Sequence, residues 1–297
     1  MRVMPAGTKG GAMASGRDHS RPVCRTCGVQ YPFPEPPATE PERCVVCTDE
    51  RQYVGWDGQS WTTLDELRAT HCNRIAPEGP GIYGIGTEPV FAIGQRALFV
   101  QAPGGNVLWD CITLVDDATV GAVRGLGGLD AIAISHPHYY GAVIEWSRAF
   151  GDVPVYIHAA DRQWVVRADG NVVFWEGDTH EIGDGLTLVN CGVHFDGGTV
   201  LHWAHGEHGA GALLSGDIFQ VVMDRRYVSF MYSYPNLIPE HPDTVRRAVD
   251  LVRPYRFERI YGAWWGRIVN TDGAAALERS ARRYLDHLGC AEAGGAP

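Results

Sequence analysis

Short apolar runs bordered by Gly, Pro or Asp recur through the middle of the chain and predict β-strands. The runs are rich in Val, Ile and Leu, and their borders carry residues that favour turns. They lie at residues 82–86, 97–101, 106–112, 131–135, 154–157, 186–191, 199–203, 212–215 and 259–261. We therefore expect β-sheet to form a large part of the core.

Patterns with helical spacing lie before, between and after these runs. The segments are residues 62–68, 140–150, 160–165, 242–252 and 273–287. In the last segment, Leu277, Ala281, Tyr284 and Leu288 recur near one face of a helix. Strands and helices in this order indicate an α/β or α+β fold.

The two ends of the chain differ in composition from the middle. Residues 1–20 are rich in Gly, Ala and Ser without periodicity, so we expect a flexible segment at 1–21 and a frayed tail at 291–297. A cysteine-containing module is expected at 22–50. A connecting segment at 51–80 then leads to the main domain, predicted at residues 81–290.

Composition narrows the possible partners and location. The net charge of the 297-residue chain is −10, which argues against a general binder of nucleic-acid backbones. No apolar stretch approaches the ~18–20 residues needed to span a bilayer, and we expect no membrane partner. The first residues lack the apolar core of a secretory signal, so we expect a cytoplasmic protein.

Four of the eight cysteines form two Cys-X-X-Cys pairs, Cys24 with Cys27 and Cys44 with Cys47. Two thiolates three positions apart can grip one Zn²⁺, and a second pair completes a tetrahedron of sulfur ligands. Redox pairs or free buried cysteines are the alternative interpretation. The spacing favours a zinc-ribbon-like module with one structural zinc, in a reducing compartment.

A second group of potential metal ligands follows the ends of predicted strands. His136 and His138 come after one strand, and side chains two apart at a strand end point the same way. Asp110, His194 and Asp217 each stand at or shortly after the end of another. A lone His-X-His is a weak signal, and these three features strengthen it.

This order of features resembles the metallo-β-lactamase superfamily over residues 82–288. The resemblance implies an αβ/βα sandwich with a metal site at one edge, between its two halves. His136 and His138 match the first two positions of the family's HxHxDH motif, and His194 matches its later histidine. Asp217 matches the carboxylate that normally bridges two metals, and Asp110 an acidic residue that braces the site. The four-cysteine module lies outside the usual domain, so the chain would be a divergent member with an N-terminal extension.

The chain also departs from the family pattern. Tyr140 and Gly141 stand where HxHxDH has Asp and His, and Ala263 stands where the last histidine is expected. Every ligand specific to the second metal is therefore missing. We expect a mononuclear core site made of three histidines and Asp217.

One metal in such a site favours hydrolysis of a small-molecule substrate. Three histidines fit Zn²⁺, and water bound to such a metal has a pKa near ~7. The chain has no serine-nucleophile motif and no phosphate-binding glycine loop. Asp217 would orient the water or act as a general base, and Tyr140 would donate a hydrogen bond to a developing oxyanion.

Two other interpretations use the same residues. His136, His194 and Asp217 form a two-histidine, one-carboxylate set that suits non-haem Fe(II), as in superfamily members that resemble persulfide dioxygenases. The core metal is thus zinc or iron. The third interpretation is a non-catalytic descendant that binds a ligand.

Aromatic and arginine side chains are predicted near the site. Tyr139, Trp264 and Trp265 would line the substrate pocket, with the two tryptophans filling the volume of the lost second metal. Arg225, in the aromatic segment that follows Asp217, or alternatively Arg226 or Arg267, would bind an anionic group, so the substrate is expected to be aromatic or anionic. His158 is expected to be structural, and residues 202–208 to form a solvated hairpin loop.

Overall fold

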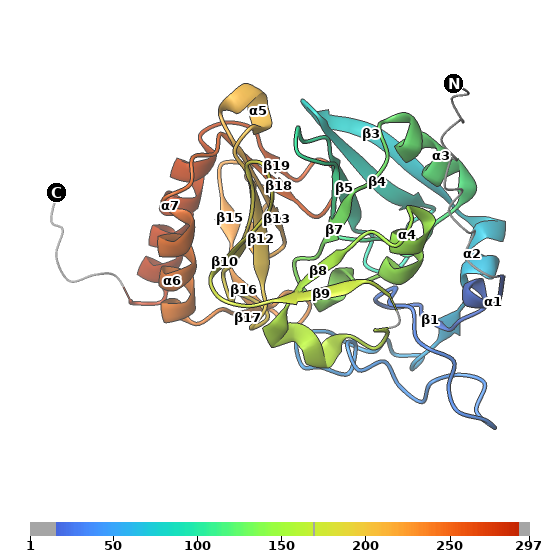
Figure 1. Ribbon diagram of the computed structural model, residues 1–297. Helices are drawn as coiled ribbons and strands as arrows, with labels where there is room; N and C mark the ends of the chain where they lie inside the picture. Colours follow the sequence, from blue (N-terminus) through green and yellow to red (C-terminus); the bar gives the residue numbers. More distant parts are fainter. Residues whose placement is uncertain (1–15, 169, 291–297) are drawn as a thin grey trace, which may run out of the picture.

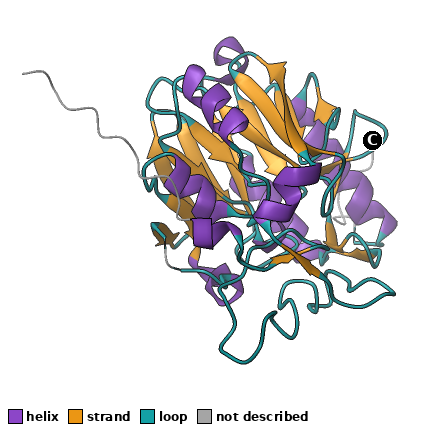
Figure 2. Ribbon diagram, turned by 90° about the vertical axis from the view of Figure 1, so that its right-hand side faces the viewer, coloured by secondary structure: helices purple, strands orange, loops and turns teal. Residues whose placement is uncertain are grey.

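Two β-sheets pack face to face and carry helices on their outer faces in the computed structural model, which describes residues 16–168 and 170–290 (Figure 1). Figure 2 shows the same layers from the side, with long loops gathered below the sheets. The arrangement is an αβ/βα sandwich. Within the described residues, no helix is long and apolar enough to cross a bilayer.

The first sheet has seven strands in the order β3-β4-β5-β6-β7-β8-β9. Its strands are β3 (Cys72–Gly79), β4 (Ile82–Glu88), β5 (Arg96–Val100), β6 (Val107–Trp109), β7 (Ala131–Ala133), β8 (Val155–His158) and β9 (Val172–Trp175). Pairing is antiparallel from β3 to β6 and parallel from β6 to β9. Parallel neighbours need crossover connections, which α3 (Asp117–Gly125), α4 (Val143–Ala149) and the 3₁₀ helix η2 (Ala159–Trp164) supply in turn.

The second sheet has six strands in the order β10-β11-β12-β13-β18-β19. They are β10 (Thr179–Gly183), β11 (Leu186–Asn190), β12 (Thr199–Trp203), β13 (Ala212–Gly216), β18 (Arg259–Gly262) and β19 (Ile268–Val269). Helices α6 (Pro242–Val252) and α7 (Gly273–His287) cover its outer face (Figure 1). Smaller elements complete this half: α5 (Gly206–Gly209) and the pairs β14 (Gln220–Val221) with β15 (Val228–Ser229), and β16 (Met231–Ser233) with β17 (Ile238–Pro239).

Apolar side chains fill the space between the layers. Leu98 and Trp109 of the first sheet share a buried cluster with Leu188, Leu201 and Leu214 of the second. These residues alternate along their strands with residues that face the helices, as expected where a sheet is buried on both faces. The sandwich therefore fixes where each strand ends, and the candidate ligands follow those ends.

Most predicted elements are present. Every predicted strand exists, but the one predicted at 106–112 ends at Trp109, because Asp110 has a left-handed φ of 60°. The helices predicted at 242–252 and 273–287 match α6 and α7. The segment at 140–150 becomes helical only at Val143, after the 3₁₀ turn η1 (Pro137–Tyr139), and the segment at 160–165 is the 3₁₀ helix η2 (Ala159–Trp164).

The four-cysteine module packs onto the first sheet as part of the same core. Strand β1 (Val23–Cys24) pairs with β2 (Trp61–Thr62), which leads into α2 (Leu64–Thr70). Thr113 Oγ1 donates to the Gly28 carbonyl at 2.8 Å, and the Gln30 amide donates to the Gly141 carbonyl at 3.0 Å. The boundaries placed at 21, 50 and 80 stay predictions, and packing is continuous across the one at 50.

The two expected flexible ends fall largely outside the described residues. These are residues 1–15 and 291–297. The described part of the N-terminal segment begins with the short helix α1 (Gly16–His19).

Gly141 lies where the chain leaves η1, in a place that excludes a side chain. Its φ is +49°, and a Cβ added there would stand 2.7 Å from both the carbonyl carbon and oxygen of Ile112. Real Cβ atoms do not approach backbone this closely, so the neighbouring strand end would have to move. The histidine that the family pattern has at this position cannot fit here without such a shift.

We expect Cys24→Ser to destabilise the whole protein and not only the module. The cysteines share a buried cluster with Ile85, Phe99 and Leu108 of the first sheet, so loss of a structural metal weakens the common core. The expected loss is more than about 3 kcal/mol, or roughly 6–12 °C in Tm, in one transition by calorimetry. Cys72→Ser, at an exposed thiol, is the control and should change nothing. Two separate transitions would contradict the shared core.

We expect Gly141→Ala to cost more stability than Gly151→Ala. Both glycines have positive φ, but a Cβ on Gly151 meets no atom within 4 Å. Gly151→Ala should lose about 1–2 kcal/mol from backbone strain alone. Gly141→Ala should lose a further ~1–3 kcal/mol from the contact with Ile112, measured by urea unfolding. If both variants lose the same free energy of unfolding, the backbone at Ile112 moves aside without cost and the prediction is wrong.

Candidate metal centres

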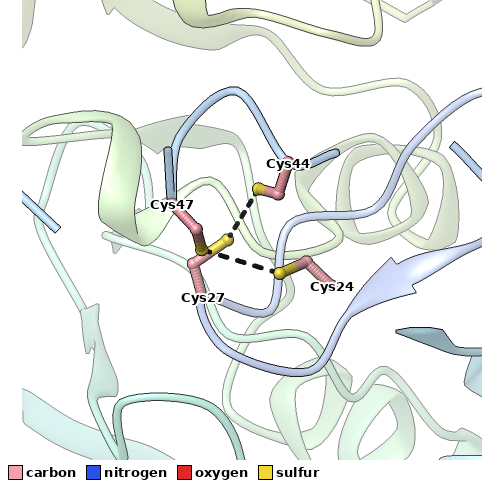
Figure 3. Close-up of side chains that lie close together, drawn as sticks. All are labelled: Cys24, Cys27, Cys44 and Cys47. Atoms are coloured by element: carbon pink, nitrogen blue, oxygen red, sulfur yellow. Dashed lines mark hydrogen bonds between the residues drawn. The ribbon is translucent and has the colours of Figure 1, made fainter. Parts of the chain in front are cut away.

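The four module cysteines converge on one point (Figure 3). The Sγ atoms of Cys24 and Cys47 lie 3.6 Å apart, and those of Cys27 and Cys44 lie 3.5 Å apart. All four are buried, and none forms a disulfide. A tetrahedral zinc with Zn–S bonds of ~2.3 Å places its sulfurs about 3.8 Å apart, so the spacing fits one such ion.

The surroundings of the cysteines also suit a cation. Burial raises the pKa of the Cys27 thiol well above its ordinary value, so the four thiols do not all ionise unless positive charge lies among them. The Tyr31 hydroxyl donates to Cys44 Sγ and the Gln59 amide donates to Cys24 Sγ, each at 3.2 Å. Donors of this kind stabilise metal-bound thiolates from outside the ligand shell. The closed set leaves no position for a substrate.

Three histidines form the second centre. His136 follows β7, His138 lies in η1, and His194 follows β11. The centroids of their rings are 4.8–5.0 Å apart, and the candidate ligand atoms lie within 4.8 Å of one another. Residues 58 positions apart in the sequence thus meet because their strands end at the same edge of the sandwich.

Hydrogen bonds determine which ring nitrogens remain for a metal. His194 Nδ1 faces the Tyr232 carbonyl at 2.7 Å and must donate to it, which leaves Nε2 with its lone pair. That Nε2 lies 3.1 Å from His138 Nδ1. His136 Nδ1 contacts Ser135 Oγ at 2.9 Å.

Asp217 places a carboxylate beside one of the three rings, that of His136. Its Oδ1 lies 3.3 Å from His136 Nε2, and neither atom has a hydrogen-bond partner among the described residues. His138 Nε2 also lacks a partner there. Buried polar atoms without partners are costly, and two lone pairs facing each other repel. A metal ion or a proton between them removes the repulsion, so these residues fit a cation.

Burial controls the protonation of the centre. It lowers the pKa of His136 and His138 well below the usual value and that of His194 to about 4. The three imidazoles are therefore neutral at pH 7, as metal ligation requires. Burial also raises the pKa of Asp217 to about 7, because its charge lacks solvation.

Asp110 holds the strand ends together beneath the centre. Its Oδ1 accepts from the Ser135 amide at 2.8 Å, next to His136, and burial raises its pKa to about 8. A Cβ on Gly216 would lie 3.0 Å from Asp110 Oδ2, so Gly216 lets the strand before Asp217 approach. Asp110 thus positions two ligand-bearing strand ends and is not itself among the converging atoms.

The tyrosine nearest the ligands is Tyr139. Its ring lies 4.5 Å from that of His136, and its buried hydroxyl lies beside the Asp217 carboxylate. Tyr140, to which the sequence assigned the oxyanion contact, instead donates to the Asp161 carbonyl at 3.4 Å. The 3₁₀ turn rotates the two neighbouring side chains to different surroundings.

The other predicted pocket residues are spread more widely. Trp264 lies near Tyr139, with ring centroids 6.5 Å apart, and donates to the Ile93 carbonyl. Trp265 packs against the Arg74 guanidinium at 4.4 Å. Arg225 donates to the Gly266 carbonyl and the Val222 carbonyl in a turn of the second half. The structure therefore brings Tyr139 to the histidines and gives Trp265 and Arg225 other contacts.

A buried guanidinium occupies the region where the family pattern has its last histidine. The Arg96 amide donates to the Ala263 carbonyl at 2.8 Å, and its guanidinium donates to the Gly262 carbonyl. Arg96 also pairs with Glu78 at 3.3 Å. A fixed positive charge beside Ala263 makes this end of β18 unsuitable for a second cation.

Sequence reasoning missed several side chains around the centre. The Phe195 ring lies 5.0–5.5 Å from all three imidazoles, and the Arg51 guanidinium lies 4.1 Å from the Phe195 centroid. Phe195 had a signal in its position beside His194, whereas nothing in the sequence singles out Arg51. Tyr234, in the predicted aromatic segment, donates to the Asp217 carbonyl at 2.7 Å.

The structure agrees with the expectation for His158 and only partly with that for the histidines of residues 202–208. His158 accepts from the Ala160 amide and contacts the Gly177 carbonyl, so it is structural. Residues 202–208 connect β12 to β13 as a hairpin with α5. His202, however, is buried within β12 and contacts the Arg256 carbonyl, so that end of the segment is not solvated.

Comparison with solved structures shows the fold. The DIM-1 metallo-β-lactamase is 16% identical and superposes with a TM-score of 0.55, covering 72% of this chain and 98% of that one. The TMB-1 structure is 14% identical with a TM-score of 0.54, covering 71% and 97%. VMB-1 is 12% identical with a TM-score of 0.52, covering 73% and 98%. Their shared architecture confirms the predicted αβ/βα sandwich.

Comparison with sequences shows the family. No protein-family model matches the chain. The protein YmaE of Bacillus subtilis (strain 168), described as uncharacterized, is 46% identical over 268 residues, which span 90% of this chain and 96% of YmaE. The chain therefore belongs to the same family as YmaE and has the metallo-β-lactamase fold, with an N-terminal four-cysteine module.

Proposed function

We propose that the protein is a metal-dependent hydrolase that uses a mononuclear zinc centre to activate water against a small-molecule substrate. One observation carries the proposal: three neutral, buried imidazoles converge, one of them beside the Asp217 carboxylate, and His136 Nε2, His138 Nε2 and Asp217 Oδ1 have no hydrogen-bond partner among the described residues. Three protein ligands, with the fourth position left for water, are typical of catalytic zinc sites, and three histidines are one such set. The metallo-β-lactamase fold supports the same chemistry by analogy.

The ligands of the proposed ion are His136, His138 and His194, with Asp217 beside them. A zinc ion bound there would supply a Lewis acid and lower the pKa of a water molecule toward neutrality. Asp217 would hold that water and accept its proton, since its carboxylate lies beside the ligand nitrogen of His136, 3.3 Å from Nε2.

Tyr139 replaces Tyr140 as the proposed hydrogen-bond donor to the developing oxyanion. Its hydroxyl is buried, and burial raises its pKa well above the ordinary value, so it stays protonated. The hydroxyl also lies within electrostatic reach of Asp217. A protonated donor held in a dry site stabilises negative charge more strongly than water does.

His138 favours zinc over iron in this proposal. A two-histidine, one-carboxylate iron centre needs only His136, His194 and Asp217. His138 is as close to the other two rings as they are to each other, which favours the set with three histidines. Elemental analysis of the purified protein distinguishes the two metals.

The partners and location remain proposals from composition. We propose a small substrate with an aromatic or anionic group; the Tyr139 and Phe195 rings beside the histidines support an aromatic one. The acidic balance of the chain argues against a nucleic-acid partner. We also propose a cytoplasmic location, which the cysteine spacing supports because it is typical of metal sites in a reducing compartment.

We expect His136→Ala and His194→Ala each to remove the core metal while the fold persists. Elemental analysis should find one metal per chain, in the four-cysteine module, instead of two. Hydrolysis of a panel of chromogenic esters, lactones and β-lactams should fall at least ~100-fold for any compound the native protein cleaves. His287→Ala, at an exposed position on α7, is the control and should keep both metals and the activity. Full activity in His136→Ala would remove the histidines from the reaction.

We expect metal binding at the core site to displace a proton that Asp217 and His136 share. Because the pKa of Asp217 is raised to about 7, the empty site holds this proton below pH 7 and loses it as the pH rises above 7. Calorimetric Zn²⁺ titrations in buffers of different ionisation enthalpy should show about one more proton released by the native protein than by Asp217→Asn at pH 6. The difference should vanish by about pH 8.5. A difference that is independent of pH would contradict this assignment.

A further inference from the structure

A short segment of the N-terminal module contacts the histidine centre, through the His194 carbonyl and the ring of Phe195. It consists of residues 49–52, called the strap below, and it begins two positions after Cys47. The three histidines are only 1–3% exposed. A hydrolytic centre must admit its substrate, so some part of the chain around them has to move.

Arg51 connects the strap to the centre. Its guanidinium lies over Phe195 at 4.1 Å, with the rings of Tyr232 at 5.3 Å and Trp164 at 5.5 Å. It also donates to the His194 carbonyl at 3.4 Å. His194 has a left-handed φ of 68°, and this contact helps to hold its backbone there.

The charge of Arg51 is balanced within the strap. Its Nε lies 2.6 Å from Asp49 Oδ1, and its terminal nitrogen donates to Asp49 Oδ2 at 3.0 Å. The paired side chains are 13% and 12% exposed, so they form a largely buried neutral unit. Arg51 and Asp49 can therefore leave the site together without separating opposite charges.

The hairpin β16–β17 holds the strap from the side. The Tyr232 hydroxyl donates to the Glu50 carboxylate, and the Asn236 amide donates to the Glu50 and Gln52 carbonyls at 3.0 and 3.1 Å. The Ser233 hydroxyl donates to the Arg51 carbonyl at 3.1 Å. Most of these contacts are polar and lie at or near the surface, which is the kind of attachment that opens locally at low cost.

The two ends of the strap differ in how firmly they are fixed. On one side, the Cys44–Cys47 turn leads directly into it, and the four-cysteine site fixes that turn. On the other side, Tyr53 and Trp56 are exposed, and a Cβ on Gly55 or Gly58 would meet nothing within 4 Å. The strap is thus anchored at the metal end and followed by a loosely packed loop.

We propose that the strap is a gate over the histidine centre, that the four-cysteine site holds it closed, and that Arg51 is a positioning residue for His194. This proposal rests on the proposed hydrolytic function, because the gate would regulate entry of substrate to that same site. Opening would swing residues 49–52 away from Phe195 about the Cys47 end and release the hairpin contacts. The four-cysteine module would then control access to the site without contacting the substrate.

The test measures access to the histidines and needs no substrate. Full-length protein, stripped of core metal but loaded at the four-cysteine site, is treated with diethyl pyrocarbonate, which modifies neutral imidazoles. Labelling rates of His136, His138 and His194 are then read by peptide mass spectrometry. The exposed His287 is the internal reference.

The variant that tests the gate is Tyr232→Phe with Asn236→Ala. It removes three hydrogen bonds to the strap and keeps the Tyr232 ring under Arg51. We expect labelling of the three core histidines to rise about tenfold to a hundredfold, since each of the three bonds contributes a factor of about two to five. Tyr227→Phe, at a ring beside Arg283 of α7, is the matched control and should label like the native protein. If this double variant folds and its core histidines are labelled at the native rate, the strap does not act as a gate.

A second arm tests the four-cysteine site as the anchor. Removing its metal as well, with circular dichroism to confirm that the sheets persist, should raise labelling of the core histidines at least as much. If the sheets are lost, Cys47→His provides the same comparison with the metal retained by a weaker ligand set, and should raise labelling by a smaller factor. Labelling that is insensitive to both changes would overturn the anchor.

A separate measurement tests whether Arg51 positions His194. Arg51→Lys keeps the charge but loses the paired contacts with Asp49, and Arg51→Ala loses both. We expect the NMR signals of the His194 ring to broaden or shift in both variants, and more in Arg51→Ala. Unchanged His194 signals would contradict a positioning role. If labelling shows a gate but the native protein binds no metal at the histidines, the gate is supported and the proposed hydrolase function is wrong.

Discussion

The structure depends on one constraint: buried histidine and aspartate atoms meet at the edge of the sandwich with lone pairs that no donor satisfies. His136 Nε2 and Asp217 Oδ1 face each other at 3.3 Å in a place that water does not reach. Such an arrangement is costly unless a cation lies within it. The strand ends, the Asp110 brace and the left-handed backbone of His194 hold these atoms in place against that cost.

The same physics explains why one metal, and not two, suits this centre. Gly141 has no room for a side chain, since a Cβ would reach the Ile112 backbone at 2.7 Å. At the other family position, the Arg96 guanidinium lies buried beside Ala263 and pairs with Glu78. The volume and charge that a second ion needs are thus taken by backbone and by a fixed cation. The four-cysteine module contacts the same glycine, since the Gln30 backbone amide donates to the Gly141 carbonyl at 3.0 Å.

The sequence predicted the parts of the molecule that depend on local pattern and on rare residue types. Paired cysteines, and histidines gathered at strand ends, are typical of metal binding, so both centres could be predicted by residue. Strand β3 was missed because Asn73, Arg74 and Glu78 break its apolar alternation. The roles of Tyr139 and Tyr140 could not be separated, because a 3₁₀ turn decides which ring faces His136. Arg51 could not be found, since its partner His194 lies 143 positions away.

The most direct test of the account is anomalous diffraction from crystals of the native protein, recorded on both sides of the zinc and iron absorption edges. The account predicts one zinc ion among the four cysteine sulfurs and one ion bound by His136, His138 and His194. It also predicts no ion beside Ala263 and Gly141. A metal-replete crystal without an ion at the histidines, or with two ions there, would contradict it.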